Sequence, residues 1–337
     1  MLSNLRSKIV VSALLGLLVL IVLGLFGDIR QVGRSFGAFQ WVTLPAILGF
    51  TLFNYVLRWL KWDYYLRRME MDQGVSRAES GLLFTSGMVM AVTPGKVGEV
   101  LKSYLLKRIN GTPISASAPI VLAERLTDGL SMLLLMGLGL TLYAPARPAF
   151  FTLLGLSLAG IVLLQFRPLM ERLLAIVARL PFGTRIAPRL LTAYVSSQRL
   201  LSWRLLLVST AISVVSWFGE CVAFYYVLRG LGQPPSYLLL LQATFIFAAS
   251  TLFGLVSFLP GGLGVSEASC TGLLIVLVGM TAGPATTATI IIRFCTLWFG
   301  VTLGAIALAI LGRRYGKEQQ VGEQPVGEET AVHIVTR

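Results

Sequence analysis

The sequence predicts an all-α polytopic membrane protein. Of its 337 residues, 55% are hydrophobic and only 13% are charged, which is about half the charged fraction of a typical soluble domain. Long apolar stretches recur along the chain, and cations gather in the polar segments between them. This composition excludes an ordinary water-soluble enzyme. We expect about six crossing helices plus two re-entrant broken-helix hairpins in an inverted repeat.

Six apolar stretches approach or exceed the roughly 20 residues that cross a bilayer. They cover residues 9–26, 41–60, 117–142, 149–166, 205–228 and 285–311. The first resembles a signal peptide, but no small-residue cleavage pattern follows, so we expect a retained helix. From Arg313 the chain turns polar without apolar periodicity. We therefore predict an integral membrane domain over residues 1–312 and a disordered cytoplasmic tail over residues 313–337.

Two further apolar stretches, residues 80–108 and 237–280, are interrupted. Proline removes a backbone donor and glycine permits positive φ, so each stretch is expected to form two half-helices joined by unwound backbone. Such backbone is tolerated at membrane depth only inside protein or along a wet cavity. The residues that break the helices are Pro94, Gly95 and Gly98 in the first stretch and Pro260, Gly261, Gly262 and Gly264 in the second.

The distribution of cations predicts the orientation. A net charge of +13 in a soluble protein would suggest nucleic acid. Here, with the N-terminus inside, 20 cations including Lys61 and Lys102 fall on the cytoplasmic side and only four fall outside. We therefore expect a cytoplasmic (plasma) membrane protein with both termini in the cytoplasm and no nucleic-acid partner. Residues 167–204 mix Arg with Leu, Ile and Val, which fits an amphipathic stretch on anionic lipid or an ordinary solvated loop.

Charged residues at membrane depth are the candidates for a site. Each costs roughly 2.5–3.5 kcal/mol on insertion scales and usually faces a bundle interior or a cavity. The acids are Glu99, Glu124, Asp128, Glu220 and Glu267, and the cations are Arg58, Lys96, Arg125 and Arg293. Arg58 is the weakest candidate because it could snorkel to the interface. Arg125 and Asp128 are expected to pair on one helix face, and Glu220 needs a partner on another helix. The alternative is that these charges pair only to hold the bundle.

The two breaks also form an internal repeat. Each has Pro-Gly-x-x-Gly followed by a glutamate, and an arginine follows 31 residues after Pro94 and 33 residues after Pro260. Three predicted crossings separate the breaks, so the hairpins enter from opposite sides, as in transporters with a midplane site. Half-helix N-termini, Lys96 and the two arginines favour an anionic group. Phosphate is the natural ligand, and a carboxylate fits nearly as well.

Histidine and cysteine chemistry has little material in this chain. The single histidine, His333, lies in the polar tail, and the three cysteines lie in apolar stretches. A histidine-based metal site or a Ser-His-Asp arrangement is therefore not expected. We predict no metal, no cofactor and no catalytic residues, which favours a transporter over an enzyme.

These motifs resemble the lysylphosphatidylglycerol synthase transmembrane region family, also called flippase-like. The resemblance covers roughly residues 5–312 and rests on the segment from Pro94 to Glu99, on Glu124-Arg125-x-x-Asp128, and on the segment from Leu259 to Glu267. It implies movement of a charged lipid between leaflets. In the full-length synthase a soluble catalytic domain is joined to this region. Here about 25 polar residues follow Arg313, so aminoacyl transfer by this chain alone is not expected.

We therefore predict a flippase or translocator for a phosphate-bearing lipid, aminoacylated or glycosylated. Lys96, Arg125 and Arg293 would hold the phosphate, while acids would bind a cationic head group or balance the arginines. One alternative is a membrane-embedded transferase for polyprenyl-phosphate-linked sugars, with Glu or Asp as base. The other is an ion-coupled transporter of a small anion. Expected partners are membrane lipids, a second copy in a homodimer, and a separate lipid-modifying synthase.

Overall fold

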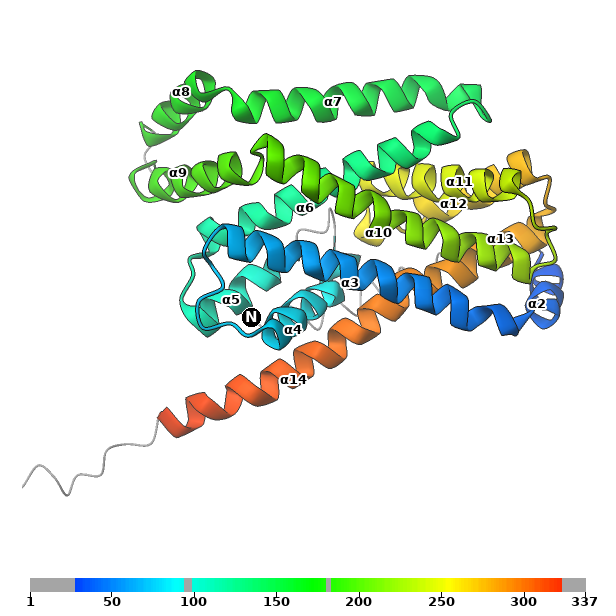
Figure 1. Ribbon diagram of the computed structural model, residues 1–337, viewed down its shortest axis with the longest axis horizontal. Coiled ribbons are helices and arrows are strands. Elements are labelled where there is room, and N and C mark those ends of the chain that lie inside the picture. Colours follow the sequence, from blue (N-terminus) through cyan, green and yellow to red (C-terminus); the bar gives the residue numbers. More distant parts are fainter. Residues whose placement is uncertain (1–27, 94–98, 180–182, 323–337) are drawn as a thin grey trace, which may run out of the picture.

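The computed structural model describes residues 28–93, 99–179 and 183–322, and these residues are almost entirely helical (Figure 1). No strand occurs in the described part of the chain. The all-α prediction is confirmed. The predicted first crossing helix at residues 9–26, the residues of the first break from Pro94 to Gly98, and residues 323–337 of the predicted tail lie outside the described residues.

The helices follow one another with short connections. The long helices are α2 (Ile29–Ala38), α3 (Leu44–Arg68), α4 (Arg77–Gly87), α5 (Leu101–Asn110), α6 (Ile114–Leu138), α7 (Arg147–Gln165), α8 (Arg167–Ala178), α9 (Gly183–Leu200), α10 (Trp203–Gly230), α11 (Tyr237–Val256), α12 (Val265–Leu273), α13 (Ala282–Arg293) and α14 (Phe299–Gly322). Short turns of tighter or wider helix join them, namely η1 (Trp41–Thr43), η2 (Met88–Val92), η4 (Ala144–Ala146), η5 (Pro260–Gly262), η6 (Leu274–Val278) and η7 (Phe294–Trp298).

Six described segments are long and apolar enough to cross a membrane. They are Trp41–Arg68, Ala144–Gln165, Trp203–Gly230, Tyr237–Val256, Pro260–Val278 and Ala282–Tyr315. Four of them overlap predicted crossings, and the other two are the halves of the second broken stretch. Each of those halves is long enough to cross by itself, so the re-entrant path of this hairpin stays a prediction. Helix α6 covers most of the predicted crossing at 117–142 and ends at Leu138, but its charged residues keep it outside this set.

Helices α3 and α10 form the centre of the bundle and run in opposite directions (Figure 1). Gly219 allows their close approach, since a Cβ there would lie 2.9 Å from the Phe53 ring. Asn54 of α3 also donates a hydrogen bond to the Ser216 hydroxyl of α10, at 2.9 Å. Helices α6 and α11 pack against α10, while α4 and η2 pack against α14. The pair α3 and α10 thus lies between the helices of the first interrupted stretch and those of the second.

The two interrupted stretches lie toward different ends of the bundle, and short turns from both meet inside it. Figure 1 shows α4 and α5 near one end and α11 to α13 toward the other. Turn η2 of the first hairpin contacts turn η5 of the second. The Val92 Cα lies 3.5 Å from the position that a Cβ on Gly261 would take. Two segments far apart in the sequence therefore come together, one just before the first break and the other at the second break.

The region between the two halves is helical. Helix α7 lies along the outer edge of the bundle, and none of its residues is buried. Residues 167–204 form mainly α8 and α9, and α9 packs against α6 and buries Tyr194 and Leu200. At the other end of the sequence, α14 continues to Gly322, beyond the predicted domain boundary at residue 312.

Candidate functional site

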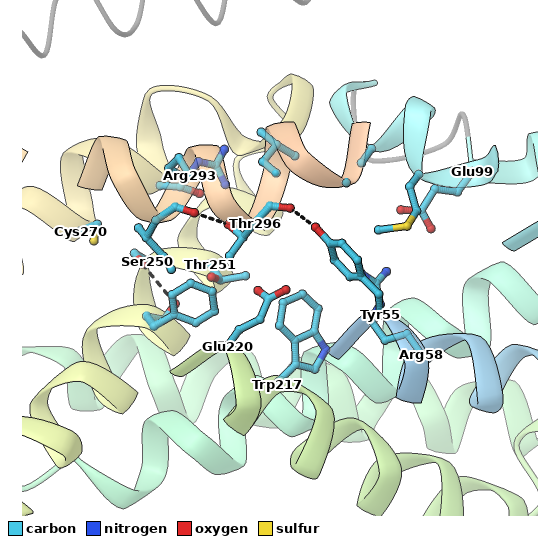
Figure 2. Close-up of a pocket in the computed structure, with 18 of the residues that line it drawn as sticks. Tyr55, Arg58, Glu99, Trp217, Glu220, Ser250, Thr251, Cys270, Arg293 and Thr296 are labelled. Carbon is cyan, nitrogen blue, oxygen red and sulfur yellow. Dashed lines mark hydrogen bonds between the residues drawn. The ribbon is translucent and has the colours of Figure 1, made fainter. Parts of the chain in front are cut away.

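A cavity of about 90 Å³ lies where helices from both halves of the chain meet (Figure 2). Five charged residues line it, contributed by α3, α10, α13, α5 and the turn just before α5. They are Arg58, Glu99, Lys102, Glu220 and Arg293. One buried water needs only about 10–15 Å³ of such space, so the cavity has room for several waters or for one small polar group. Aromatic side chains, among them Tyr55 and Trp217, complete the wall.

Each break carries a glutamate that pairs with an arginine on a later helix. Arg293 Nε lies 2.5 Å from Glu267 Oε1, and Arg125 NH2 lies 3.1 Å from Glu99 Oε2. In both pairs the glutamate precedes the arginine by 26 residues. The glutamates therefore align the two halves more closely than the prolines do. The structure brings together two pairs that the sequence suggested only as separate charges.

The second break is shaped by glycine conformation. Gly261, Gly262 and Gly264 have φ of 62°, 68° and 89°, values that residues with a Cβ rarely adopt. Glu267 then bridges the break, because its Oε2 accepts a hydrogen bond from the Gly264 N–H at 2.7 Å while its Oε1 holds Arg293. Arg293 also donates to the Gly261 carbonyl at 2.8 Å. One ion pair thus fixes the unwound backbone to both following helices.

Asp128 is the centre of a larger charge network beside the first break. Lys61 Nζ lies 2.5 Å from Asp128 Oδ1, and Arg125 NH2 lies 3.2 Å from Asp128 Oδ2. Arg58 Nε is farther away, at 4.0 Å. The Ser213 hydroxyl accepts a hydrogen bond from Lys61 at 2.7 Å and lies 3.1 Å from Asp128 Oδ1. The predicted pairing of Arg125 with Asp128 is present, and it is part of a cluster built from α3, α6 and α10.

Lys102 forms the other part of this network. Its ammonium lies 2.6 Å from Glu124 Oε2 and 4.0 Å from Glu99 Oε2. It also lies 4.6 Å from the centroid of the Trp62 ring. Its stem passes over Gly87, where a Cβ would come within 2.5 Å of Lys102 Cγ. Together with the Asp128 cluster, it links both sides of the first hairpin to α6.

The sequence interpretation missed Lys61 and Lys102, which it counted among the cytoplasmic cations. The structure buries both, with 1% and 2% of their surfaces exposed. Helix α3 continues to Arg68, so Lys61 lies on an inward face instead of at a helix end. A polar stripe was the available signal, because polar residues recur at spacings of three and four along this helix. All are buried in the structure, and they are Thr51, Asn54, Arg58, Lys61 and Tyr65.

Arg58 and Glu220 both lie on the cavity wall. Arg58 is 9% exposed, so it is buried instead of snorkelling to the interface, which removes the reason for ranking it as the weakest candidate. Glu220 is 3% exposed on α10. Figure 2 shows its carboxylate pointing into the cavity near Thr251 and Trp217. Across the cavity Glu220 faces residues of α3 and α11, and its pairing with a partner on another helix stays a prediction.

The charged side chains of the cavity and its adjoining network, which we call the charged core, balance in number among the described residues. Five are cations and five are acids, namely Arg58, Lys61, Lys102, Arg125, Arg293, Glu99, Glu124, Asp128, Glu220 and Glu267. Lys96 lies outside the described residues. Guanidinium groups can bind an oxyanion in two-pronged fashion, and a carboxylate can hold a proton or an ammonium group. Within the described ranges, no group of three or more His, Cys, Asp and Glu residues is placed to hold a metal ion.

Comparisons with known proteins identify related chains. The profile of the family described as Lysylphosphatidylglycerol synthase TM region matches residues 10–304. A UPF0104 membrane protein of Methanothermobacter thermautotrophicus is 24% identical, with 87% of this chain and 90% of the relative covered. A UPF0104 membrane protein of Pyrococcus horikoshii is 25% identical, with 86% of this chain and 92% of the relative covered. No solved structure matches the chain.

Proposed function

The chain belongs to the lysylphosphatidylglycerol synthase TM region family, and on this premise we propose that it moves a phosphate-bearing lipid between the two leaflets of the cytoplasmic membrane. An aminoacyl or a glycosyl group on this lipid is compatible with the proposal as long as the phosphate still reaches the cavity. Both termini would lie in the cytoplasm. The proposal places the head group in the cavity and leaves the acyl chains in the surrounding lipid.

The observation that carries this proposal is the charged cavity where helices from both halves of the chain meet. Charge at membrane depth is expensive and usually serves a polar pathway. Here charged residues from both halves of an apolar bundle converge on one small space, which is the arrangement expected of a midplane substrate site. The cavity volume of about 90 Å³ suits a compact polar group and is too small for acyl chains.

The predicted phosphate-binding residues differ in how well their positions support that role. Arg293 lies on the cavity wall, which supports a contact with the head group. Arg125 lines a separate space of about 20 Å³ and is held between Glu99 and Asp128. We therefore propose that Arg125 positions the first hairpin and that Arg293 does the same for the second hairpin at the edge of the site. Glu220 would carry a proton or bind an ammonium group of the lipid.

Proteoliposomes test this function. The purified full chain is reconstituted with trace lipids that carry a fluorescent acyl chain, and a membrane-impermeant quencher reports how much label reaches the outer leaflet. We expect faster equilibration of a phosphatidyl lipid than in protein-free vesicles. Glu220→Gln should slow it at least about tenfold if the carboxylate contributes one charge-assisted contact during transit. Glu171→Gln, which alters an exposed acid on α8, is the matched control and should retain the wild-type rate.

The same vesicles separate the alternatives. Uptake of labelled inorganic phosphate without any lipid movement would instead support the small-anion transporter. Formation of a new lipid-linked sugar from a polyprenyl-phosphate donor would support the transferase. Equal lipid movement in wild-type, Glu220→Gln and protein-free vesicles would contradict the proposed function.

A further inference from the structure

We propose that Arg58 is the side chain of the cavity that binds a phosphate oxyanion. This inference rests on the proposed function in one respect, which is that the phosphate belongs to a lipid head group. Sequence reasoning gave this role to Lys96, Arg125 and Arg293 and treated Arg58 as the weakest candidate. Among the described residues, the contacts favour Arg58 over Arg125 and Arg293.

Arg58 differs from the other four cations of the charged core in its carboxylate contacts. Each of the others has a carboxylate oxygen within 3.1 Å, at 2.5 Å for Lys61, 2.6 Å for Lys102, 3.1 Å for Arg125 and 2.5 Å for Arg293. The ion pair of Arg58 with Asp128 is 4.0 Å long, and its buried Nε makes no hydrogen bond. Asp128 is already bound by Lys61 and Arg125. Arg58 is therefore the cation of this set whose charge is least satisfied.

The surroundings of Arg58 hold it in place without using its donors. Its guanidinium lies 5.3 Å from the centroid of the Trp217 ring and 5.8 Å from that of Phe84. Contacts of this kind attract the cation through the ring face and leave its N–H groups available in the guanidinium plane. Figure 2 shows Arg58 at the cavity beside Tyr55. A flat, fixed guanidinium at the wall of a polar cavity is prepared for two-pronged binding of an oxyanion.

Energetics favours an anion at this position. A buried charged donor without a hydrogen-bond acceptor is more costly than a neutral donor in the same position. A phosphate oxygen in the cavity would remove that cost. Arg293, the other arginine on the wall, already donates to Glu267 and to the Gly261 carbonyl. Its remaining donors would serve as a secondary contact.

Binding to the purified full chain in detergent micelles tests the assignment by native mass spectrometry. The probes are dioleoyl phosphatidic acid, dioleoylglycerol, which is the same lipid without phosphate, and inorganic phosphate. We expect wild-type protein to prefer phosphatidic acid over dioleoylglycerol. Arg58→Gln should weaken phosphatidic acid binding about tenfold or more, as loss of a charge-assisted contact does, and leave dioleoylglycerol binding unchanged. Arg58→Lys should recover part of the preference, because lysine keeps the positive charge but lacks the coplanar N–H donors of the guanidinium.

Arg67→Gln is the matched control. Arg67 is on the same helix, but its side chain is 41% exposed and pairs with Asp63 at the surface. This variant should bind all probes as wild type does. A thermal unfolding profile of Arg58→Gln close to that of wild type establishes that the comparison concerns folded protein. If Arg58→Gln does not fold, Arg58→Lys is compared with wild type for its preference between the two lipids.

The outcomes separate this inference from the proposed function. Competition by inorganic phosphate at the same site would support the oxyanion assignment with free phosphate as a source, and binding of the lipid alone would support it with the head group as source. Wild-type preference for phosphatidic acid in the folded Arg58 variant, or no preference in wild type, overturns the assignment. Lipid movement at the wild-type rate by Arg58→Gln vesicles would overturn it and leave the flippase standing. Phosphate-selective binding that depends on Arg58, without lipid movement, would support the role of Arg58 and contradict the flippase function.

Discussion

The glutamate that follows each break pairs with an arginine on a later helix, but the two pairs have very different surroundings. At the second break, Glu267 and Arg293 pair with each other, and their further hydrogen bonds go to the backbone of the break. At the first, Glu99 and Arg125 share a network with Lys102, Glu124 and Asp128. The shared spacing of 26 residues thus places an equivalent glutamate–arginine pair in each half of the chain. The helices packed around each pair decide how many further charges contact it.

This difference teaches which contacts are redundant. In the first network, most members have a second partner of opposite charge, so loss of one contact is partly compensated. Loss of Asp128 is not compensated in this way, because three cations share this one carboxylate. In the second hairpin, a single carboxylate both neutralises the arginine and holds the unwound backbone. The two halves should therefore respond differently to matched substitutions.

The largest effect is expected for Asp128→Asn. The substitution leaves Lys61 and Arg125 buried without this carboxylate, and breaking a buried ion pair from one side costs about 3–5 kcal/mol. Thermal unfolding in detergent, followed by intrinsic fluorescence, should show a large drop in Tm and a smaller monodisperse fraction. Asp72→Asn, at a partly exposed pair with Arg67, is the control and should change Tm little. A Tm for Asp128→Asn within the error of wild type would show that the network is not centred on this residue.

Glu267→Gln and Glu99→Gln compare the two halves directly. We expect the first to cost about 3 kcal/mol, because Arg293 loses its partner and the Gly264 cap is weakened. The second should cost about 1 kcal/mol, because Arg125 keeps Asp128 and Lys102 keeps Glu124. Tm and the urea or detergent dependence of unfolding give both values on one scale. Equal losses in the two variants would mean that the first network provides no compensation.

Packing at the two hairpins provides the next comparison, through Gly304→Ala and Gly254→Ala. A Cβ on Gly304 would lie 2.4 Å from the Val89 backbone nitrogen, whereas one on Gly254 would lie 1.8 Å from the Ser266 hydroxyl oxygen. A hydroxyl can rotate away and backbone cannot, so Gly304→Ala should cost more, at about 1–3 kcal/mol for overpacking. Gly129→Ala, with nothing within 4 Å, is the control and should be neutral or slightly stabilising. The reverse order of Tm values would contradict the packing of the first hairpin on α14.

The smallest effect concerns pH and the entrance to the first hairpin. Hydrogen bonds from the Tyr315 hydroxyl, and from the Ser76 backbone and hydroxyl, lower the pKa of Glu79 below its ordinary value. Because the pKa is lower in the folded state, the stabilisation is present above the unfolded pKa, about 4.3, and is lost as pH falls toward the folded value. Glu79→Gln should lower Tm slightly at pH 7, with a difference that shrinks below about pH 4.

The second hairpin gives the control for this pH dependence. Helix α11 is capped by Ser236, which accepts a hydrogen bond from the Leu239 N–H and does not titrate. Ser236→Ala should therefore lower Tm by the same amount at pH 7 and at pH 4. A difference between wild type and Glu79→Gln that stays constant across this range would contradict the role assigned to the Glu79 carboxylate.

Apolar length and helix-breaking residues were sufficient to predict most of the fold. The crossings near α3, α7, α10, α13 and α14, and the second interruption from Pro260 to Gly264, follow from composition and glycine conformation. For residues 167–204 the sequence allowed two alternatives, a solvated loop or an amphipathic segment. The structure has helices α8 and α9 there. In these helices arginines are interspersed among apolar residues, so the sequence contains no long apolar run that would identify them.

The candidate site was predicted less completely. Arg125, Asp128, Glu220 and Arg293 were predicted as site residues because each is a charged residue within an apolar helix. Counting cations by side placed Lys61 and Lys102 in the cytoplasm, because that rule treats a lysine near a helix end as a loop residue. Whether such a lysine faces inward depends on where its helix stops and on what packs against it. Neither fact is contained in a local charge count.

The sequence by itself determined that this is an all-α membrane protein with a helix break at residues 260–264, because hydropathy, proline and glycine act over a few neighbouring residues. Tertiary structure alone decided which charges meet. It buried Lys61 and Lys102, joined Glu99 to Arg125 and Glu267 to Arg293, and left Arg58 at the cavity with its nearest carboxylate 4.0 Å away. Coulombic and hydrogen-bond contacts depend on distances of a few ångströms between helices that are remote in the chain, and only the packed bundle sets those distances.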